Sequence, residues 1–360
     1  MRFIPTTGGT GKHAGPASGT PVNRGLRDAD LTRRDRIFRM ILLAAAVVPS
    51  VLLLFLAAEI VREAIPAFIY SGWNFFTGHV FTFGNLYVTK ETVHNGVAAP
   101  LEAKYGAFPF IFGTLVSSLI ALVLAVPIAV GAVLALTERV PARFQSGLSI
   151  FLELLAGIPS VVYGLWGVLV FGPFLAQHIF PALTPIGHVI PFFKGPVGSG
   201  EGLLITSLIL ALMIIPIIAS TTRELLRTVP ILAKEGALAL GMTRYEIAKV
   251  VTLPYVRRGI MAASILGWAR ALGETMAVLM ISGDLLNALP ANVYSPFSTM
   301  AATIVAMLDS ALTDATGMAV HALAAIAVVL LLITVATNLV GRLVIRRASG
   351  GAVLPVGRGI

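Results

Sequence analysis

The chain has 360 residues, of which 57% are hydrophobic and only 12% are charged, and it contains no cysteine. Soluble domains are about half apolar and about a quarter charged, so this composition argues against a soluble protein and favours one that lies in a membrane. The lack of cysteine excludes disulfides and thiolate metal sites. The formal net charge of +9 is interpreted first as a signal of membrane topology, because positively charged residues concentrate in cytoplasmic segments. Nucleic-acid binding is not expected.

Residues 1–38 are rich in Gly, Pro and Arg and poor in large apolar residues, which predicts a disordered cytoplasmic tail. The stretch GGTGKH within this tail resembles a phosphate-binding loop. Thr6 stands where the first glycine of that loop belongs, His13 replaces the Ser or Thr, and no apolar strand precedes it. Nucleotide binding by this chain is therefore not expected.

Six runs of about 18 or more weakly charged residues follow, each long enough to cross a hydrocarbon core about 30 Å thick. Prolines within these runs do not exclude helices, because neighbouring helices in lipid can satisfy the freed backbone groups, and a bend at Pro159 could expose backbone to an aqueous path. We therefore predict an all-α integral membrane protein whose transmembrane domain covers residues 39–345. The expected spans are residues 40–61, 108–136, 148–172, 203–221, 259–283 and 317–341.

The distribution of Lys and Arg predicts the orientation of these spans. Cytoplasmic segments are enriched in positively charged residues. Both ends, the 222–258 loop and a C-terminal tail of residues 346–360 are therefore expected in the cytoplasm. The segments 1–39, 137–147, 222–258 and 342–360 carry 8, 2, 7 and 4 of the 26 Lys and Arg residues, whereas the opposite side carries four.

The 222–258 loop is too charged to cross a membrane but carries the signals of two short helices. Thr228 can cap the first helix, and Pro230 fits its first turn, where the missing N–H is harmless. Gly241 can supply the left-handed turn that ends this helix.

The second short helix follows directly. Thr243 and Glu246 fit a capping box, in which each side chain accepts a hydrogen bond from the backbone N–H of the other residue. Pro254 is expected to end this helix or the turn after it. The helix pair would bury its apolar side against the same protein or in a groove of a partner.

The stretch EGALALGMTRYEIAKVVTLP in this loop resembles the cytoplasmic signature of ABC importer permeases, in which Glu-Ala-Ala, three residues, Gly and a later Leu-Pro recur. The resemblance implies that the short helices dock into grooves of a partner ATPase. Gly236 departs from the signature by replacing its first alanine, which lowers helix propensity by roughly 1 kcal/mol. The residues assigned to coupling are Glu235, Gly236, Ala237, Gly241, Thr243, Glu246, Leu253 and Pro254.

Three further stretches, YGAFPFIFGTLVSSLIALVLAVPIAVG, ELLAGIPSVVYGLWG and RALGETMAV, together resemble PstC-type permease subunits of phosphate importers over residues 105–345. The resemblance implies a type I ABC importer permease fold in a bacterial inner membrane. It also implies a non-catalytic subunit, without a cofactor of its own, that passes inorganic phosphate to the cytoplasm. The implied partners are a PstA-type permease subunit, a dimeric ATPase that binds ATP and Mg, an extracytoplasmic phosphate-binding protein and membrane lipid.

In the fifth expected span, Arg270 and Glu274 are four residues apart and so share one face of a helix. A lone charge at mid-bilayer costs at least about 2.5 kcal/mol, so both should face a protein interior or a water-filled cavity. The pair could be an ion pair that joins two helices. Alternatively, Arg270 could line the path of an oxyanion, because its guanidinium stays charged and offers paired donors, with Glu274 holding it when the site is empty.

Glu153 is a further buried acid, either a partner of Arg270 or a carboxylate that reaches water near the cytoplasmic end of its span. His321 is expected to be a packed or interfacial residue rather than a ligand, and no metal site is expected.

Importers of other oxyanions, such as sulfate or molybdate, remain open. A self-sufficient secondary transporter would leave the capped helix pair unexplained, and an enzyme is disfavoured by the small set of buried ionisable residues.

Overall fold

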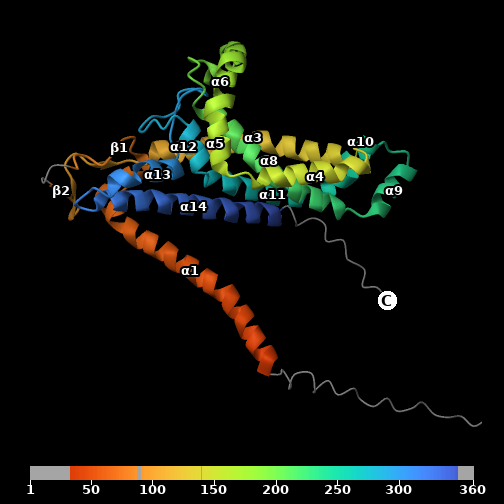
Figure 1. Ribbon diagram of the computed structural model, residues 1–360, viewed down its shortest axis with the longest axis horizontal. Helices are drawn as coiled ribbons and strands as arrows, with labels where there is room; N and C mark the ends of the chain where they lie inside the picture. Colours follow the sequence, from red (N-terminus) through yellow and green to blue (C-terminus); the bar gives the residue numbers. More distant parts are fainter. Residues whose placement is uncertain (1–32, 87–90, 139, 348–360) are drawn as a thin grey trace, which may run out of the picture. The chain divides into compact units, whose positions relative to one another are not determined.

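Figure 1 shows the computed structural model of the chain, which describes residues 33–86, 91–138 and 140–347. The described residues are mostly helical, which confirms the predicted all-α class apart from two small β pairs. The chain divides into two units, residues 1–57 and 58–360.

The described part of the first unit consists of the first residues of helix α1 (Arg33–Ser71). The rest of this helix belongs to the second unit. The side chains of residues 35–56 are exposed and largely apolar on all sides of the helix, as expected for a helix surrounded by lipid. Residues 33–38 are helical, although they were predicted to belong to a disordered tail. The rest of that predicted tail, and residues 348–360 of the C-terminal one, lie outside the described residues.

Between α1 and α3 the second unit contains a small mixed segment that the sequence did not predict. Asn95 and Gly96 are both left-handed, with φ of 55° and 79°, which is the geometry of a tight hairpin turn. This turn joins β2 to β3, and the pairing β1–β4 lies over an aromatic cluster that includes Phe81 and Tyr105. The elements are α2 (Asn74–Thr77), β1 (Phe81–Thr82), β2 (Glu91–His94), β3 (Val97–Pro100) and β4 (Lys104–Tyr105).

Five helices in the described part of the chain are long and apolar enough to cross a membrane, so the predicted count of six is not exact. The first, second, fourth and last predicted spans each correspond to one of these helices. The third and fifth, residues 148–172 and 259–283, do not form as predicted. The five helices lie in α1, α3 (Phe108–Glu138), the run Ser160–Leu183, α8 (Leu203–Arg227) and α14 (Met318–Arg347).

The third predicted span is broken at Pro159. Helix α4 (Ala142–Gly157) ends there because proline has no N–H and disfavours a helical conformation for the residue before it, Ile158, whose backbone is extended. A helical run begins again at Ser160 and contains two π-type turns. It comprises α5 (Ser160–Trp166), η2 (Gly167–Phe171), α6 (Gly172–Phe174), η3 (Leu175–Ile179) and α7 (Phe180–Leu183), followed by the 3₁₀ turns η4 (Thr184–His188) and η5 (Pro191–Phe193).

The fifth predicted span is also interrupted. Helix α11 (Leu253–Leu272) ends before Gly273, and α12 (Met276–Ile281) begins three residues later. The N–H groups of Gly273 and Glu274 bond to carbonyls three residues back, which tightens and closes the last turn of α11. After α12 the chain continues through α13 (Met300–Ala311) to α14.

The 222–258 loop contains the predicted helix pair with different limits. Helix α8 extends to Arg227, so Thr228 is its C-cap and bonds back to the Leu225 carbonyl instead of capping the next helix. Pro254 does not end a helix, because it lies in the first turn of α11, where its missing N–H would be tolerated. The elements are α9 (Ile231–Ala239), α10 (Arg244–Ile247) and η6 (Ala248–Thr252), and η6 leads directly into α11.

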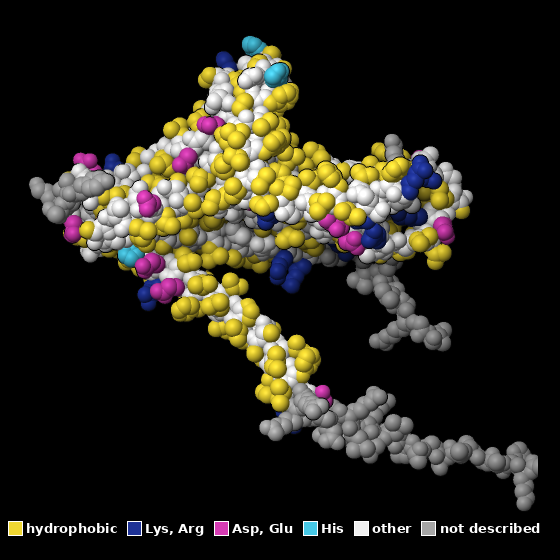
Figure 2. Space-filling model, viewed as in Figure 1, with side chains coloured by type: hydrophobic (Ala, Val, Ile, Leu, Met, Phe, Trp, Pro, Cys, Tyr) yellow, Lys and Arg dark blue, Asp and Glu magenta, His cyan; other side chains and the backbone are white. Residues whose placement is uncertain are grey.

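Helix α8 is the centre of the second unit. It contacts α3, α4 and α11, and α11 in turn contacts α14 (Figure 1). Gly267 of α11 permits a close approach to α8, since a methyl group there would lie 3.0 Å from Ile218. Large apolar areas remain exposed on the surface of the second unit (Figure 2), as lipid or another membrane subunit would require.

Candidate functional site

Two interrupted helices meet in the second unit. Helices α5 and α12 each begin directly after an interruption, and they pack on one another. Gly164 makes the closest approach, because a methyl group there would lie 3.0 Å from Ala277 Cα and 3.0 Å from Met280 Sδ. Gly167 lies in the same way against Ile281. The two glycines therefore allow the run that begins with α5 to pack closely along α12.

The first interruption has a defined structure. Ile158 and Pro159 are both extended, with ψ of 129° and 140°. The Tyr163 hydroxyl donates a hydrogen bond of 3.0 Å to the Leu155 carbonyl across the break. This bond satisfies one of the carbonyls that a helix C-terminus leaves without an intrahelical partner. The bend predicted at Pro159 is present, and Tyr163 is a residue of the site that the sequence did not single out.

The second interruption separates Arg270 from Glu274. Arg270 lies in the last turn of α11, whereas Glu274 lies between α11 and α12. The prediction that both share one face of one helix is therefore wrong, because the helix ends at Leu272. Among the described residues, neither side chain has an ion-pair partner, so the structure does not contain the predicted ion pair between them.

Arg270 lies on an exposed face of α11. The opposite face of this helix is buried against α8, α3 and α14, through Val256, Ile260, Ala263, Gly267 and Ala271. Ala262, Leu266 and Arg270 repeat every four residues and are exposed. This exposed stripe combines the guanidinium of Arg270 with the apolar side chain of Leu266. Such a combination is compatible with a surface that a second subunit would cover.

Glu153 pairs with a residue that was not predicted. Its carboxylate lies 3.9 Å from Arg223 Nη1 on α8, and not beside Arg270. The Arg223 side chain is only 15% exposed, whereas that of Glu153 is 66% exposed and so reaches the surface. The sequence placed Arg223 in the loop because the predicted fourth span ended at residue 221.

Helix α9 and its C-cap residue present exposed apolar side chains. Ile231, Leu232 and Leu240 are 71%, 81% and 80% exposed, whereas Ala237 is buried against the rest of the loop. Gly241 has φ of +81°, and the N–H groups of Gly241 and Met242 bond to Leu238 and Ala237, which closes the helix as predicted. Glu235 and Gly236 are exposed on the same helix.

The predicted capping box at the start of α10 is confirmed. The Glu246 N–H bonds to the Thr243 hydroxyl at 3.3 Å, and the Thr243 N–H bonds to the Glu246 carboxylate at 2.8 Å. The Thr243 backbone and hydroxyl donors favour the ionised carboxylate, which lowers the pKa of Glu246 below its ordinary value. Leu253 and Pro254 follow in the first turn of α11.

His321 is packed, as expected. Its Nδ1 lies 2.8 Å from the Glu63 carbonyl oxygen of α1. Within the described residues no group of three or more His, Cys, Asp or Glu is arranged to hold a metal ion.

Residues 127–350, more than half of the chain, match the protein family described as "Binding-protein-dependent transport system inner membrane component". The chain belongs to this family. Such a component of an importer agrees with the long apolar helices and with the signature in the 222–258 loop.

Relatives of this inner membrane component cover nearly its whole length. "Phosphate transport system permease protein PstC 1" of Mycobacterium tuberculosis is 51% identical over 88% of this chain and 94% of that protein. PstC of Mesorhizobium japonicum is 35% identical over 91% of this chain and 95% of that protein. A crystal structure of a bacterial ABC transporter involved in alginate import is 16% identical, covers 86% of this chain and 98% of that one, and has a TM-score of 0.50. These matches confirm the predicted family and the importer permease fold.

Proposed function

We propose that this chain is the membrane-spanning subunit of an ATP-driven importer that passes inorganic phosphate into the cytoplasm. Relatives named PstC phosphate permeases, 51% and 35% identical over most of both chains, support this function. The subunit itself carries out no catalysis and holds no cofactor, since ATP and Mg belong to a partner ATPase. Sulfate and molybdate are the competing substrates to be tested.

The orientation of the subunit follows from its charges. Both ends and the 222–258 loop face the cytoplasm, because the segments on that side hold nearly all Lys and Arg residues. Helix α9 then projects on the ATPase side. The exposed Leu232 of α9 and Leu240, which directly follows the helix, suit insertion into an apolar groove of that partner. A PstA-type permease subunit covers the exposed stripe of α11, and a phosphate-binding protein delivers substrate on the opposite side.

The observation that carries the proposal is the position of Arg270. It is an exposed guanidinium at the end of an interrupted helix, inside a segment that was predicted to span the membrane. A guanidinium presents planar paired donors to phosphate and remains charged in any surroundings. Glu274 follows Arg270 by four residues, so it is near enough in sequence to compete with the anion when no phosphate is bound at Arg270. Arg270 therefore receives phosphate on the path, and Glu274 limits how tightly it is held.

The test is ATP-dependent phosphate uptake into proteoliposomes that contain this chain, its permease and ATPase partners and the binding protein. Arg270→Gln is expected to abolish uptake while assembly and ATP hydrolysis persist. Arg270→Lys should retain only part of the uptake, because a lysine offers no paired planar donors. Sulfate added in excess should not compete with phosphate.

A matched control is Arg257→Gln, which removes an exposed cation from the first turns of the same helix. This variant should transport normally. Normal uptake by Arg270→Gln would remove Arg270 from the path, competition by sulfate would change the substrate, and uptake without the ATPase would reject the importer function itself.

A further inference from the structure

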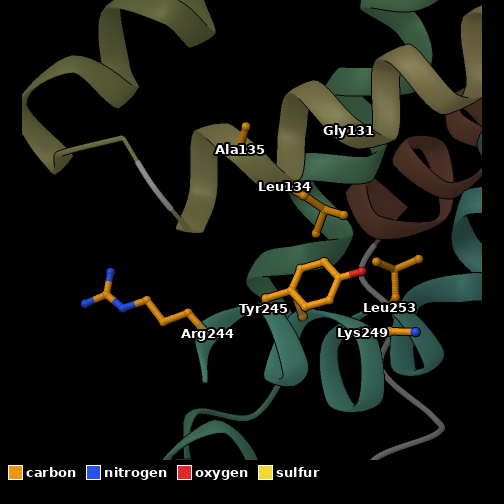
Figure 3. A pocket seen from close by; sticks show the side chains of 8 residues that line it. Gly131, Leu134, Ala135, Arg244, Tyr245, Lys249 and Leu253 are labelled. Atoms are coloured by element: carbon orange, nitrogen blue, oxygen red, sulfur yellow. The ribbon is translucent and has the colours of Figure 1, made fainter. Parts of the chain in front are cut away.

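A groove of about 670 Å³ lies between the end of α3 and the segment from α10 to the start of α11 (Figure 3). Leu134 of α3 lies across the groove from Tyr245 and Leu253, and these side chains converge on it in Figure 3. Gly131 leaves the groove open along α3, because a methyl group there would meet nothing within 4 Å. The middle of the groove is therefore apolar.

Positive charge borders this apolar middle. Arg244 and Lys249 line the groove, and Figure 3 shows their charged ends directed away from Leu134, to opposite sides. The acid between them in sequence, Glu246, is engaged by Thr243 in the capping box. Figure 2 shows Lys and Arg side chains gathered at the end of the second unit that carries α9 and α10. The segment 244–258 holds four cations and one acid.

The groove also lies at one end of a membrane-spanning helix. Gly131 and Leu134 belong to the last two turns of the apolar run Phe108–Thr137, where the span reaches the membrane surface. The exposed Tyr245 has an apolar ring and a polar hydroxyl, the pattern of residues at the level of lipid headgroups. In the orientation of the proposed function, on which this inference rests, this end faces the cytoplasmic leaflet.

We propose that this groove binds an anionic phospholipid of the cytoplasmic leaflet. One acyl chain lies along Gly131, Leu134 and Leu253, and the phosphate headgroup is bound at the rim by Lys249. Basic pockets beside transmembrane helices on the cytoplasmic side are suited to anionic headgroups. The apolar middle favours a lipid over free phosphate, which has nothing to bury there. The bound lipid would stabilise the packing of α10 and η6 against the C-terminal end of α3.

The probe is a photoactivatable phosphatidylglycerol, compared with a phosphatidylcholine that carries the same acyl label, in nanodiscs that contain the full chain. Peptide mapping should place the phosphatidylglycerol label on residues 131–135 and 245–253. Lys249→Gln should lower that labelling about five-fold, since a cation near an anionic membrane surface contributes about 1 kcal/mol. Lys249→Arg should restore it, and phosphatidylcholine labelling should not change.

Gly131→Leu should lower labelling by both lipids, because its side chain fills the open space in the groove. Ala135→Leu provides a second blocking variant on the same exposed face of α3. Gly147→Leu is the matched control, because Gly147 of α4 is also open to a larger side chain but does not line the groove. Labelling in Gly147→Leu should equal that of the native chain.

Three outcomes would overturn the proposal: equal labelling by the two lipids, displacement of the label by inorganic phosphate at millimolar concentration, or its loss when the partner ATPase binds. Displacement would assign the groove to free phosphate, and loss on ATPase binding would assign it to that protein. The readout requires no transport. Selective labelling without phosphate uptake would reject the proposed function alone. Phosphate uptake without selective labelling would reject the lipid site alone.

Discussion

A methyl group at Gly164 would lie 3.0 Å from the Cα atom of Ala277, closer than nine in ten contacts of real Cβ atoms. The contact joins α5 to α12, the two half-helices that begin at the interruptions of the third and fifth predicted spans. Because Cα of Ala277 belongs to the backbone, it cannot move aside as the end of a flexible side chain can. The relative position of the two interruptions therefore depends on the lack of a side chain at residue 164.

Replacement of this glycine should separate the half-helices. Gly164→Ala is expected to lower the free energy of unfolding by about 1–3 kcal/mol, as for other added methylenes in well-packed interiors, and to reduce phosphate uptake. Thermal melting in detergent and uptake in proteoliposomes provide the two measurements. Gly157→Ala is the control, because a methyl group there meets nothing within 4 Å. Equal behaviour of the two variants would show that the close contact is not required.

The ion pair between Arg223 and Glu153 should contribute little to stability. Its shortest distance of 3.9 Å exceeds hydrogen-bond length, and the Glu153 side chain is mostly exposed. Exposed pairs contribute about 0.2–1 kcal/mol. A double-mutant cycle with Glu153→Gln and Arg223→Gln, followed by denaturation in detergent, should give a coupling energy below about 1 kcal/mol. A coupling energy above about 2 kcal/mol would contradict the open geometry of this pair.

The capping box should lose its effect in acid. The pKa of Glu246 is lowered by the Thr243 donors, so its stabilisation of α10 is fully present above the ordinary pKa of a free glutamate. That stabilisation is lost as the pH falls through the lowered value. Hydrogen exchange at the Thr243 and Glu246 amides, corrected for intrinsic rates, should therefore show protection at pH 7 that disappears in acid. Thr243→Ser should keep this pattern, whereas Thr243→Val should remove the protection of the Glu246 amide at every pH, because valine offers no acceptor to that N–H.

Asp284 should destabilise the protein at neutral pH. It follows α12, and burial raises the pKa of its carboxyl, although a 2.9 Å hydrogen bond from Ser298 partly opposes the rise. A raised acid pKa means that stability is lost as the pH rises from the ordinary value through the folded one. Asp284→Asn keeps an acceptor for Ser298 and should raise the melting temperature at pH 7. The gain should vanish well below the ordinary pKa, and a gain that persisted there would exclude the charge as its cause.

The sequence predicted the long helices well because their apolar runs leave few alternatives in lipid. The capping box was equally clear, since Thr243 and Glu246 interact with backbone groups only three residues away. Arg223 was assigned to a loop because a charged residue ends a hydropathy run, although α8 continues to Arg227. Where a span ends is a tertiary property, decided by what packs around its last turn.

The interruption at Gly273 could not be predicted from composition, because glycine is also tolerated inside helices of this chain, as Gly267 is within α11 itself. The pairing of Glu153 with Arg223 was also beyond the sequence. It depends on α4 lying beside α8, and one sequence does not state which spans are neighbours. The small β pairs were missed because strands of two to four residues carry too few positions for an alternating pattern.

The helical run from Arg244 through η6 to Leu272 has no loop within it. At about 1.5 Å per residue its 29 residues correspond to roughly 40 Å of helix, with the capped turn at one end and Arg270 at the other. Pro254 lies within this run without dividing it. A partner that moved the capped turn would therefore act on Arg270 through continuous helix rather than through a loop.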